Sequence, residues 1–398
     1  MLNANQRMRP ARRNNRQGLL PPNAARLNEP DINSIFQRIA SSRNAVENLS
    51  FDRVKFTTES MRLLIGKLGT CPKVRILSIA NSAITKAEVF EAEVVRQINE
   101  KTQLVSVTLN NVNLLDRTCS ALTTIVQESS QIHRLELPNN RITSEGAKYI
   151  ASMLADSGIV HLNVRNNNLL AAGGELIGQV LASEPHCLKT LDIGSNQVGE
   201  RCVAYLAEAM SKWRVLEAVH LDGSNVTMNG CEQLVAHIPN SSLTSLALGF
   251  NRLGDDSLDL FTQMLEEHSE TLKLKRLYLH SNQFSSDGII RFARALKGYH
   301  RLETLDLRTN VRINDSCFTA LQEAVKCHPS MRKLNLGGCG MTGSKIKELE
   351  EYVRRLRCFH SEILVSMRAA RQISRLGHRS QFSKLPIELL QQLSVTLG

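Results

Sequence analysis

Two rhythms of hydrophobic and polar positions follow one another within residues 188–215, which read LKTLDIGSNQVGERCVAYLAEAMSKWRV. Leu191 and Ile193 flank one polar residue, and this period of two predicts a short strand with one buried face. Further on, Leu206 and Met210 stand four positions apart in a helical pattern. The stretch therefore predicts a strand, a turn and a helix. Such a unit cannot bury its apolar faces alone, but it can when it is stacked on copies of itself.

Copies of this pattern recur along most of the chain, 27 to 31 residues apart. We place their starts at Val46, Val74, Leu104, Ile132, Ile159, Leu188, Leu216, Leu243, Leu274, Leu302 and Met331. The turn after the strand carries Asn140, Asn167, Asn196, Asn251, Asn282 and Asn310, with Cys339 as a substitute; Val54, Ser82, Val112 and Ser224 depart from it. A side-chain amide at this turn can hydrogen-bond backbone groups that the turn leaves unpaired.

The recurring L-x-x-L-x-L-x-x-N pattern, with a repeat near 28 residues and a full helix, resembles the ribonuclease-inhibitor type of leucine-rich repeat. The resemblance covers residues 46–360 and implies an α/β solenoid, or horseshoe, of about eleven repeats. Parallel strands would line its concave face and helices its convex face. Inhibitors, GTPase activators and sensor domains all use this fold, so the resemblance does not decide the activity.

The charge of the chain divides it into a neutral centre and two basic tails. The net charge of +11 consists of +5 in residues 1–30, zero in 31–353 and +6 in 354–398. We expect 1–30 to be disordered, 31–45 to form a capping helix and 361–398 to form a helical cap or appendage. A neutral horseshoe argues against specific nucleic-acid binding, whereas the tails are candidates for contact with anionic surfaces.

The cysteines and the start of the chain bear on localisation. Nine cysteines occur without a C-x-x-C pair. Four of them open the predicted helices, where a small apolar residue is wanted: Cys119, Cys202, Cys231 and Cys317. This favours buried free thiols in a reducing compartment over a disulfide framework. The first 30 residues contain no signal-peptide core, and no run has the roughly 18 apolar residues of a membrane helix. We therefore expect a cytoplasmic protein, with nuclear import through the N-terminal arginines as an alternative.

The concave face is the predicted binding surface, because polar residues between the apolar strand positions point into it. Side by side across neighbouring strands, they form a central row: Glu136, Asn163, Asp192, His220, Ala247, Tyr278, Asp306 and Asn335. The candidate partner-binding residues are Arg165, Asp192, His220, Asp222, Phe250, Tyr278, His280, Asp306 and Arg308. Gly194, Ala247 and Gly249 lie among them and would leave room for side chains of a partner. Tyrosine and arginine are enriched at binding hot spots. The pattern predicts a monomer that binds a partner protein.

Catalysis finds little support in the same rows of residues. Asp192 beside His220, and His280 beside Asp306 or Arg308, are the suggestive neighbours, and no Ser, Cys or Thr joins them to complete a triad. The sequence has no H-E-x-x-H motif for a metal. We predict no enzyme activity, no cofactor and no metal.

The C-terminal segment LPIELLQQL looks like the opening helix of an F-box, which begins L-P-x-E-L-L. The matching positions are Leu385, Pro386, Glu388 and Leu389. In that family the segment docks on the adaptor of a ubiquitin ligase, which makes a substrate-adaptor role one alternative function. The fifteen residues from Lys384 onward are too few for the rest of an F-box.

The function predicted from sequence is non-catalytic protein binding through the concave face. A GTPase-activating regulator is a second alternative. The neutral horseshoe with short appendages also resembles the repeat proteins that pathogenic bacteria deliver into host cells, and an effector of this kind would act in the host cytosol.

Overall fold

The protein is described by a computed structural model that covers residues 26–27, 29–41, 46–84, 103–128, 131–326 and 328–355. The chain divides into two compact units, Met1–Leu169 and Leu170–Gly398. The predicted disordered segment, apart from its last few residues, and the F-box-like segment lie outside the described residues. The domain boundaries drawn from sequence stay a prediction.

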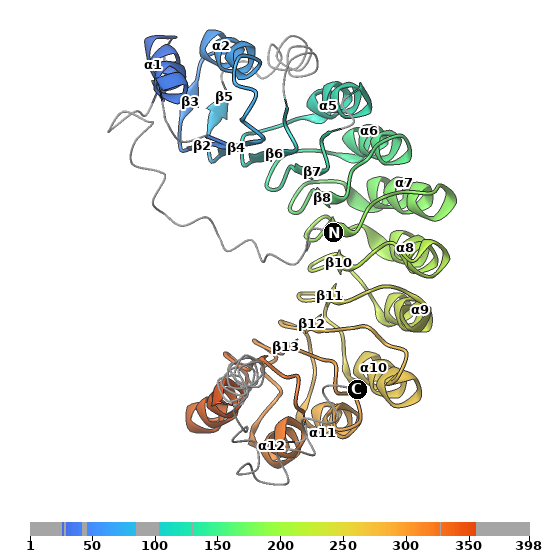
Figure 1. Cartoon of the computed structure of the whole chain (residues 1–398). Helices are drawn as coiled ribbons and strands as arrows, with labels where there is room; N and C mark the ends of the chain where they lie inside the picture. Colours follow the sequence, from blue (N-terminus) through green and yellow to red (C-terminus); the bar gives the residue numbers. More distant parts are fainter. Residues whose placement is uncertain are drawn as a thin grey trace, which may run out of the picture. The chain divides into compact units, whose positions relative to one another are not determined.

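The first unit stacks five parallel strands against a layer of helices (Figure 1). The strands pair in the order β2 (Asn48–Asp52), β4 (Ile76–Ala80), β6 (Ser106–Asn110), β7 (Arg134–Glu136) and β8 (His161–Asn163). The helices are α1 (Glu29–Ser41), α2 (Thr58–Leu68), α5 (Asp116–Glu128) and α6 (Ser144–Ala155). A small second sheet of β1 (Arg26–Leu27), β3 (Lys55–Phe56) and β5 (Ala83–Ile84) was not predicted from the sequence.

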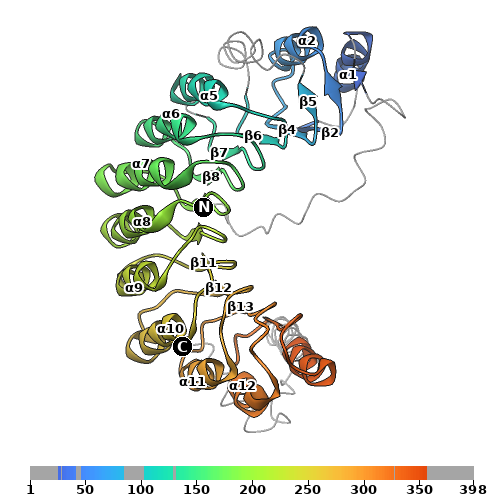
Figure 2. The ribbon, with the colours of Figure 1, turned by 180° about the vertical axis from the view of Figure 1, so that it is seen from behind.

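The second unit repeats the arrangement, and in both views its helices lie on one side of its strands (Figure 1 and Figure 2). Its parallel strands are β9 (Thr190–Asp192), β10 (Ala218–His220), β11 (Ser245–Ala247), β12 (Arg276–Tyr278), β13 (Thr304–Asp306) and β14 (Lys333–Asn335). Its helices are α7 (Leu170–Ser183), α8 (Gly199–Trp213), α9 (Met228–His237), α10 (Asp255–His268), α11 (Ser286–Leu296), α12 (Phe318–Lys326) and 343–355, with 3-10 turns η3 (Ile238–Asn240) and η4 (Asp315–Cys317).

The predicted repeat and its register are confirmed. Each of these eleven strands begins two residues after a predicted repeat start. In the repeat that defined the pattern, Leu191 and Ile193 are fully buried, and so are Leu206 and Met210 of α8. The fold is an α/β leucine-rich-repeat solenoid, as predicted. In the part of the chain that the structure describes, no helix has the length and apolarity needed to span a membrane.

The cysteines at the helix starts lie in the core. Cys119, Cys202, Cys231 and Cys317 are buried, and the seven cysteines within the described ranges are free thiols. Burial raises the pKa of Cys202 to about 12, because a thiolate there would lose its hydration. These thiols therefore serve packing.

The turn asparagines connect neighbouring repeats. The amide nitrogen of Asn282 donates to the carbonyls of Leu248 and Leu279, each at 3.0 Å. Its oxygen accepts from the backbone nitrogens of Asn251 (3.2 Å) and Leu253 (2.9 Å). The predicted role of this asparagine is confirmed, and one side chain satisfies backbone groups of two repeats.

The residue before each turn position, whether that position carries asparagine or a substitute, bends the chain out of the strand through a left-handed backbone. We call these eleven positions the exit column: Arg53, Asn81, Asn111, Asn139, Asn166, Ser195, Gly223, Phe250, Ser281, Thr309 and Gly338, with φ between 50° and 78°. Asparagine and glycine tolerate this conformation, whereas a bulky side chain rarely adopts it. The backbone therefore explains asparagine or glycine in the exit column, but it does not explain a bulky residue such as Phe250.

Candidate protein-binding face

The central row of the predicted face is confirmed by the strand register. In the second unit, His220 lies between Asp192 and Ala247, and Tyr278 lies between Ala247 and Asp306. The row ends with Asn335 beside Asp306. Residues far apart in sequence thus lie side by side in one row across six strands.

An aromatic pair stands at the exit of β11. The rings of Phe250 and His280 meet edge to face, with centroids 5.0 Å apart at 90°. The His280 ring covers Gly249 so closely that a Cβ there would lie 2.3 Å from a ring carbon. The prediction that Gly249 leaves room for a partner is therefore wrong, because the next repeat fills that space. Phe250 remains 59% exposed and belongs to the exit column, with φ of 56°.

Two of the predicted carboxylates are buried rather than presented to a partner. The Asp306 side chain is 2% exposed and accepts hydrogen bonds from Arg308 Nη2 at 2.7 Å and Asn335 Nδ2 at 3.1 Å. Burial opposes its ionisation, but the bonds from Arg308 and Asn335 outweigh burial and hold the pKa of Asp306 below its usual range. Asp222 is buried too and accepts from the Gly249 nitrogen at 2.8 Å. The expectation that both carboxylates face outward is wrong.

The buried carboxylate of Asp306 fixes the orientation of the Arg308 guanidinium. Asp306 receives Nε and Nη2 of Arg308 in a two-pronged contact, while the Arg308 side chain stays 52% exposed. A guanidinium held in this way loses little further freedom when it meets a second carboxylate. Arg308 is thus a preorganised donor on the strand face of the second unit.

The remaining acid–histidine pair is a surface feature. His220 Nδ1 lies 3.5 Å from Asp192 Oδ2, and Asp192 also accepts from the Gly194 nitrogen at 3.1 Å. On its other side His220 faces Ala247, so the row supplies no nucleophile. Within the described ranges, no three His, Cys, Asp or Glu side chains converge as metal ligands.

Tyr278 and Arg165 complete the predicted set. Tyr278 is half-buried in the central row, and burial raises the pKa of its hydroxyl, which stays a neutral hydrogen-bonding group. Arg165 belongs to the first unit, where it follows β8, whereas the other eight candidates belong to the second. Their role in binding stays a prediction.

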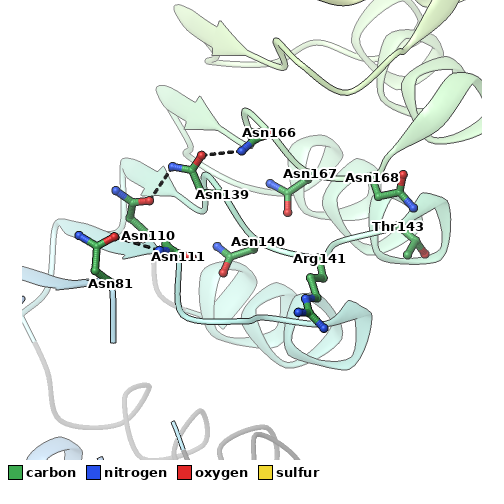
Figure 3. A pocket seen from close by; sticks show the side chains of 10 residues that line it. All are labelled: Asn81, Asn110, Asn111, Asn139, Asn140, Arg141, Thr143, Asn166, Asn167 and Asn168. Carbon is green, nitrogen blue, oxygen red and sulfur yellow. Dashed lines mark hydrogen bonds between the residues drawn. The ribbon is translucent and has the colours of Figure 1, made fainter. Parts of the chain in front are cut away.

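A polar site in the first unit was missed. Its strand exits carry asparagines whose amides are linked in two groups, Asn81 with Asn111 and Asn110 with Asn139 and Asn166 (Figure 3). They line a depression of about 690 Å³ formed by Asn81, Asn110, Asn111, Asn139, Asn140, Arg141, Thr143, Asn166, Asn167 and Asn168. The signal was present as the runs Asn110-Asn111, Asn139-Asn140 and Asn166-Asn167-Asn168. Asn140 and Asn167 follow from the repeat as turn asparagines, whereas the repeat explains neither Asn110 and Asn111 nor the neighbours of Asn140 and Asn167.

Known proteins share these repeats. A family model described as leucine-rich repeat matches residues 240–261. Ribonuclease inhibitor of Sus scrofa is 24% identical over 328 residues, which cover 81% of this chain and 71% of that protein. NACHT, LRR and PYD domains-containing protein 14 of Mus musculus is 26% identical over 70% of this chain, which spans only 25% of that relative.

A solved structure supports the fold. The crystal structure of the Rad7 and Elc1 complex in yeast contains a chain with a TM-score of 0.53 and 14% identity, matched over 74% of this chain and 71% of its own. No enzyme family is indicated by these similarities. Together with the repeats and their asparagine turns, they support a leucine-rich-repeat protein that is similar to ribonuclease inhibitor.

Proposed function

We propose that this chain is a non-catalytic module that binds a partner protein through the strand face of its second unit, with Phe250 as the anchor. Leucine-rich-repeat proteins are protein-interaction modules, and the similarities above support that class. The observation that carries the finer proposal is an aromatic ring that is exposed, braced and held on an unfavourable backbone.

The fold does not require a phenylalanine at this position. The other members of the exit column in the second unit are Ser195, Gly223, Ser281, Thr309 and Gly338, all small. A left-handed backbone costs roughly 1–2 kcal/mol for a residue with a side chain, and Phe250 also exposes apolar surface to water. Strain and exposure together favour a role in binding.

The neighbouring groups indicate the chemistry of the partner. His280, which follows β12, packs against one side of the Phe250 ring. Arg308 follows the next strand, β13, and its half-exposed guanidinium is held by Asp306. The complementary surface is an apolar pocket for the ring with a carboxylate within reach of Arg308. Tyr278 and His220 would then form part of the surrounding contacts.

The test is a site-specific photo-crosslinking experiment. A photoreactive phenylalanine analogue at position 250 should capture a partner from cell extract, whereas the same analogue at Leu115, an exposed residue of the first unit, should not. Phe250→Ser should abolish capture by an analogue at Tyr278 and leave the unfolding midpoint nearly unchanged. Equal capture from positions 250 and 115, or undiminished capture by the Phe250→Ser protein, would refute this site.

Two alternative functions, a ubiquitin-ligase adaptor and a GTPase activator, can be tested separately. The structural neighbour occurs in a complex with Elc1, and the LPIELL segment supports an adaptor role; deleting 381–398 should then remove binding to a purified ligase adaptor. A GTPase activator would accelerate GTP hydrolysis when added to small GTPases. Delivery into a host cell as a bacterial effector rests on resemblance in sequence organisation alone.

A further inference from the structure

The asparagine ladder of the first unit consists of two groups of hydrogen-bonded side-chain amides (Figure 3). One group ends at Asn111 and the other begins at the adjacent Asn110, and together they cross four repeats. Asn81 Nδ2 donates to Asp52 Oδ1 at 3.0 Å, and Asn111 Nδ2 donates to Asn81 Oδ1 at 3.0 Å. Asn139 donates to Asn110 at 2.8 Å, and Asn166 donates to Asn139 at 2.7 Å. All four bonds point the same way, toward the earlier repeat.

The ladder leaves at least half of each amide's hydrogen-bonding capacity unused. A primary amide has two N–H donors and an oxygen with two lone pairs. Within the ladder, Asn81 and Asn139 each donate one hydrogen bond and accept one. These two amides each keep one N–H and one lone pair for a ligand. Asn111 and Asn166 only donate within the ladder, so each keeps one N–H and two lone pairs, and the row offers both donors and acceptors.

The ladder also fixes the direction of these groups before a ligand arrives. Asn81, Asn111, Asn139 and Asn166 all stand in the exit column, where the left-handed backbone sets the start of the side chain. The bonds between amides set its end. A site whose side chains are already ordered loses less entropy on binding than a flexible one.

The lining of the depression decides between classes of ligand. Eight of its ten residues are asparagine, and Arg141 is the charged one. A single guanidinium is a poor basis for a phosphate site, which relies on several donors of positive charge. The lining contains no aromatic ring on which the apolar face of a sugar could stack. Neutral groups that pair N–H with C=O match one ligand class best, the peptide group.

We propose that the asparagine ladder binds an extended, uncharged stretch of polypeptide main chain. Side-chain amides would pair with backbone N–H and C=O groups, as a strand edge pairs with an added strand. The row crosses four repeats at roughly 4.8 Å each, a span of roughly 14 Å, which corresponds to about four residues of extended chain. Recognition of this kind tolerates many sequences. It does not depend on Phe250, which lies in the other unit.

The experiment follows the asparagine side-chain amides of the whole protein by NMR. The protein is labelled with ¹⁵N at asparagine and titrated with an uncharged, end-blocked tetrapeptide of alternating alanine and serine. The resonances of Asn81, Asn111, Asn139 and Asn166 should shift. The same peptide with N-methylated backbone nitrogens lacks the donors and should bind at least tenfold more weakly.

Matched variants separate binding from folding. Asn139→Asp keeps the shape of the side chain and removes its N–H donors. Asn139→Gly keeps the left-handed backbone and removes the amide. Each variant should bind the tetrapeptide at least tenfold more weakly. Ser281→Asp places the same carboxylate in the exit column of the second unit and should leave the tetrapeptide affinity unchanged. Thermal unfolding of each variant shows whether the fold is kept.

Other probes supply the results that would overturn the proposal. Maltotetraose shifting the same amides more strongly than the peptide would make this a sugar site. Inorganic phosphate shifting them, with Arg141→Gln abolishing the effect, would make it an anion site. Saturation of the ladder resonances by none of the probes at millimolar concentration, or equal binding of the N-methylated peptide, would refute main-chain recognition.

Discussion

The strand exits of the two units have the same backbone conformation but carry different kinds of side chain. In both units the exit column adopts the same left-handed conformation, and the next residue turns the chain toward the helix. After Arg53, the first unit fills the column with asparagines that hydrogen-bond to amides of neighbouring repeats, whereas the second fills it with small residues and one exposed phenylalanine. The repeat thus dictates the geometry, and the side chains that it leaves free decide what each unit can bind.

The largest expected difference between the units is their response to acid. His328 of the second unit is 1% exposed, and burial lowers its pKa from 6.5 to about 4, with His300 adding to the effect. The unfolded chain therefore binds a proton between pH 6.5 and 4 that the folded chain does not, so stability present above pH 6.5 falls by about 3 kcal/mol as the pH drops through this window. The histidines described in the first unit, His133 and His161, are not buried.

Urea unfolding followed by Trp213 fluorescence measures this loss, because the single tryptophan of the chain belongs to the second unit. The urea midpoint should fall between pH 7 and pH 4.5, and His328→Phe should remove most of the fall. A midpoint that depends on pH equally in the variant would place the titrating groups elsewhere. Hydrogen exchange of first-unit amides, corrected for intrinsic rates, should respond less to pH.

The next effect separates two adjacent asparagines of the first unit. Asn167 donates to the carbonyls of Leu137 at 2.9 Å and Val164 at 2.8 Å, so Asn167→Asp would set a carboxylate against two carbonyl oxygens. We expect a loss of about 2–4 kcal/mol. Asn166→Asp removes one exposed bond to Asn139 and should cost about 0.5–1 kcal/mol.

Denaturant unfolding of the two aspartate variants at pH 7 gives both values. The cost of Asn167→Asp should shrink near pH 3, where the protonated carboxyl can donate to one carbonyl again. Equal costs for the two variants would mean that the inner and outer asparagines share the same structural role.

The smallest effect tests the aromatic pair of the second unit. Gly249→Ala places a methyl group 2.3 Å from the His280 ring and should cost about 1 kcal/mol, because the ring must move. Gly337→Ala is the matched control: its nearest neighbour is Arg308 Cγ at 4.0 Å, and its cost should stay within about 0.5 kcal/mol. Unfolding midpoints compare the two, and only the first should weaken capture through Phe250. Equal midpoints and undiminished capture would show that His280 does not brace the ring.

Much of the repeat was predictable because it depends on periodicity. Leu191 and Ile193 alternate, the turn asparagines stand at fixed offsets, and the strand register follows from the repeat length. The central row of the second unit, from Asp192 to Asn335, therefore follows from the sequence alone, and the strand register agrees with it. Local rules of this kind require no knowledge of neighbouring side chains.

The site was less predictable because it depends on the orientation of side chains, which residues of neighbouring repeats determine. The sequence shows Gly249 as small, but the space above it belongs to His280 of the next repeat. Asp306 occupies an outward position of its strand and yet folds down under Arg308. The paired asparagines were visible, but their joining into a ladder follows from the left-handed exit column, which no propensity of single residues reveals.

The turn asparagines have a consequence for how such a chain can grow. Bonds of Asn282 reach residues 29 to 34 positions earlier, close to one repeat length. Duplication or loss of one whole repeat brings an equivalent asparagine to an equivalent turn, and every bond forms again. Gain or loss of half a repeat leaves buried carbonyls and amides without partners at a cost of several kcal/mol. Gain or loss of whole repeats of about 28 residues is therefore the change in length that keeps these bonds within the stack.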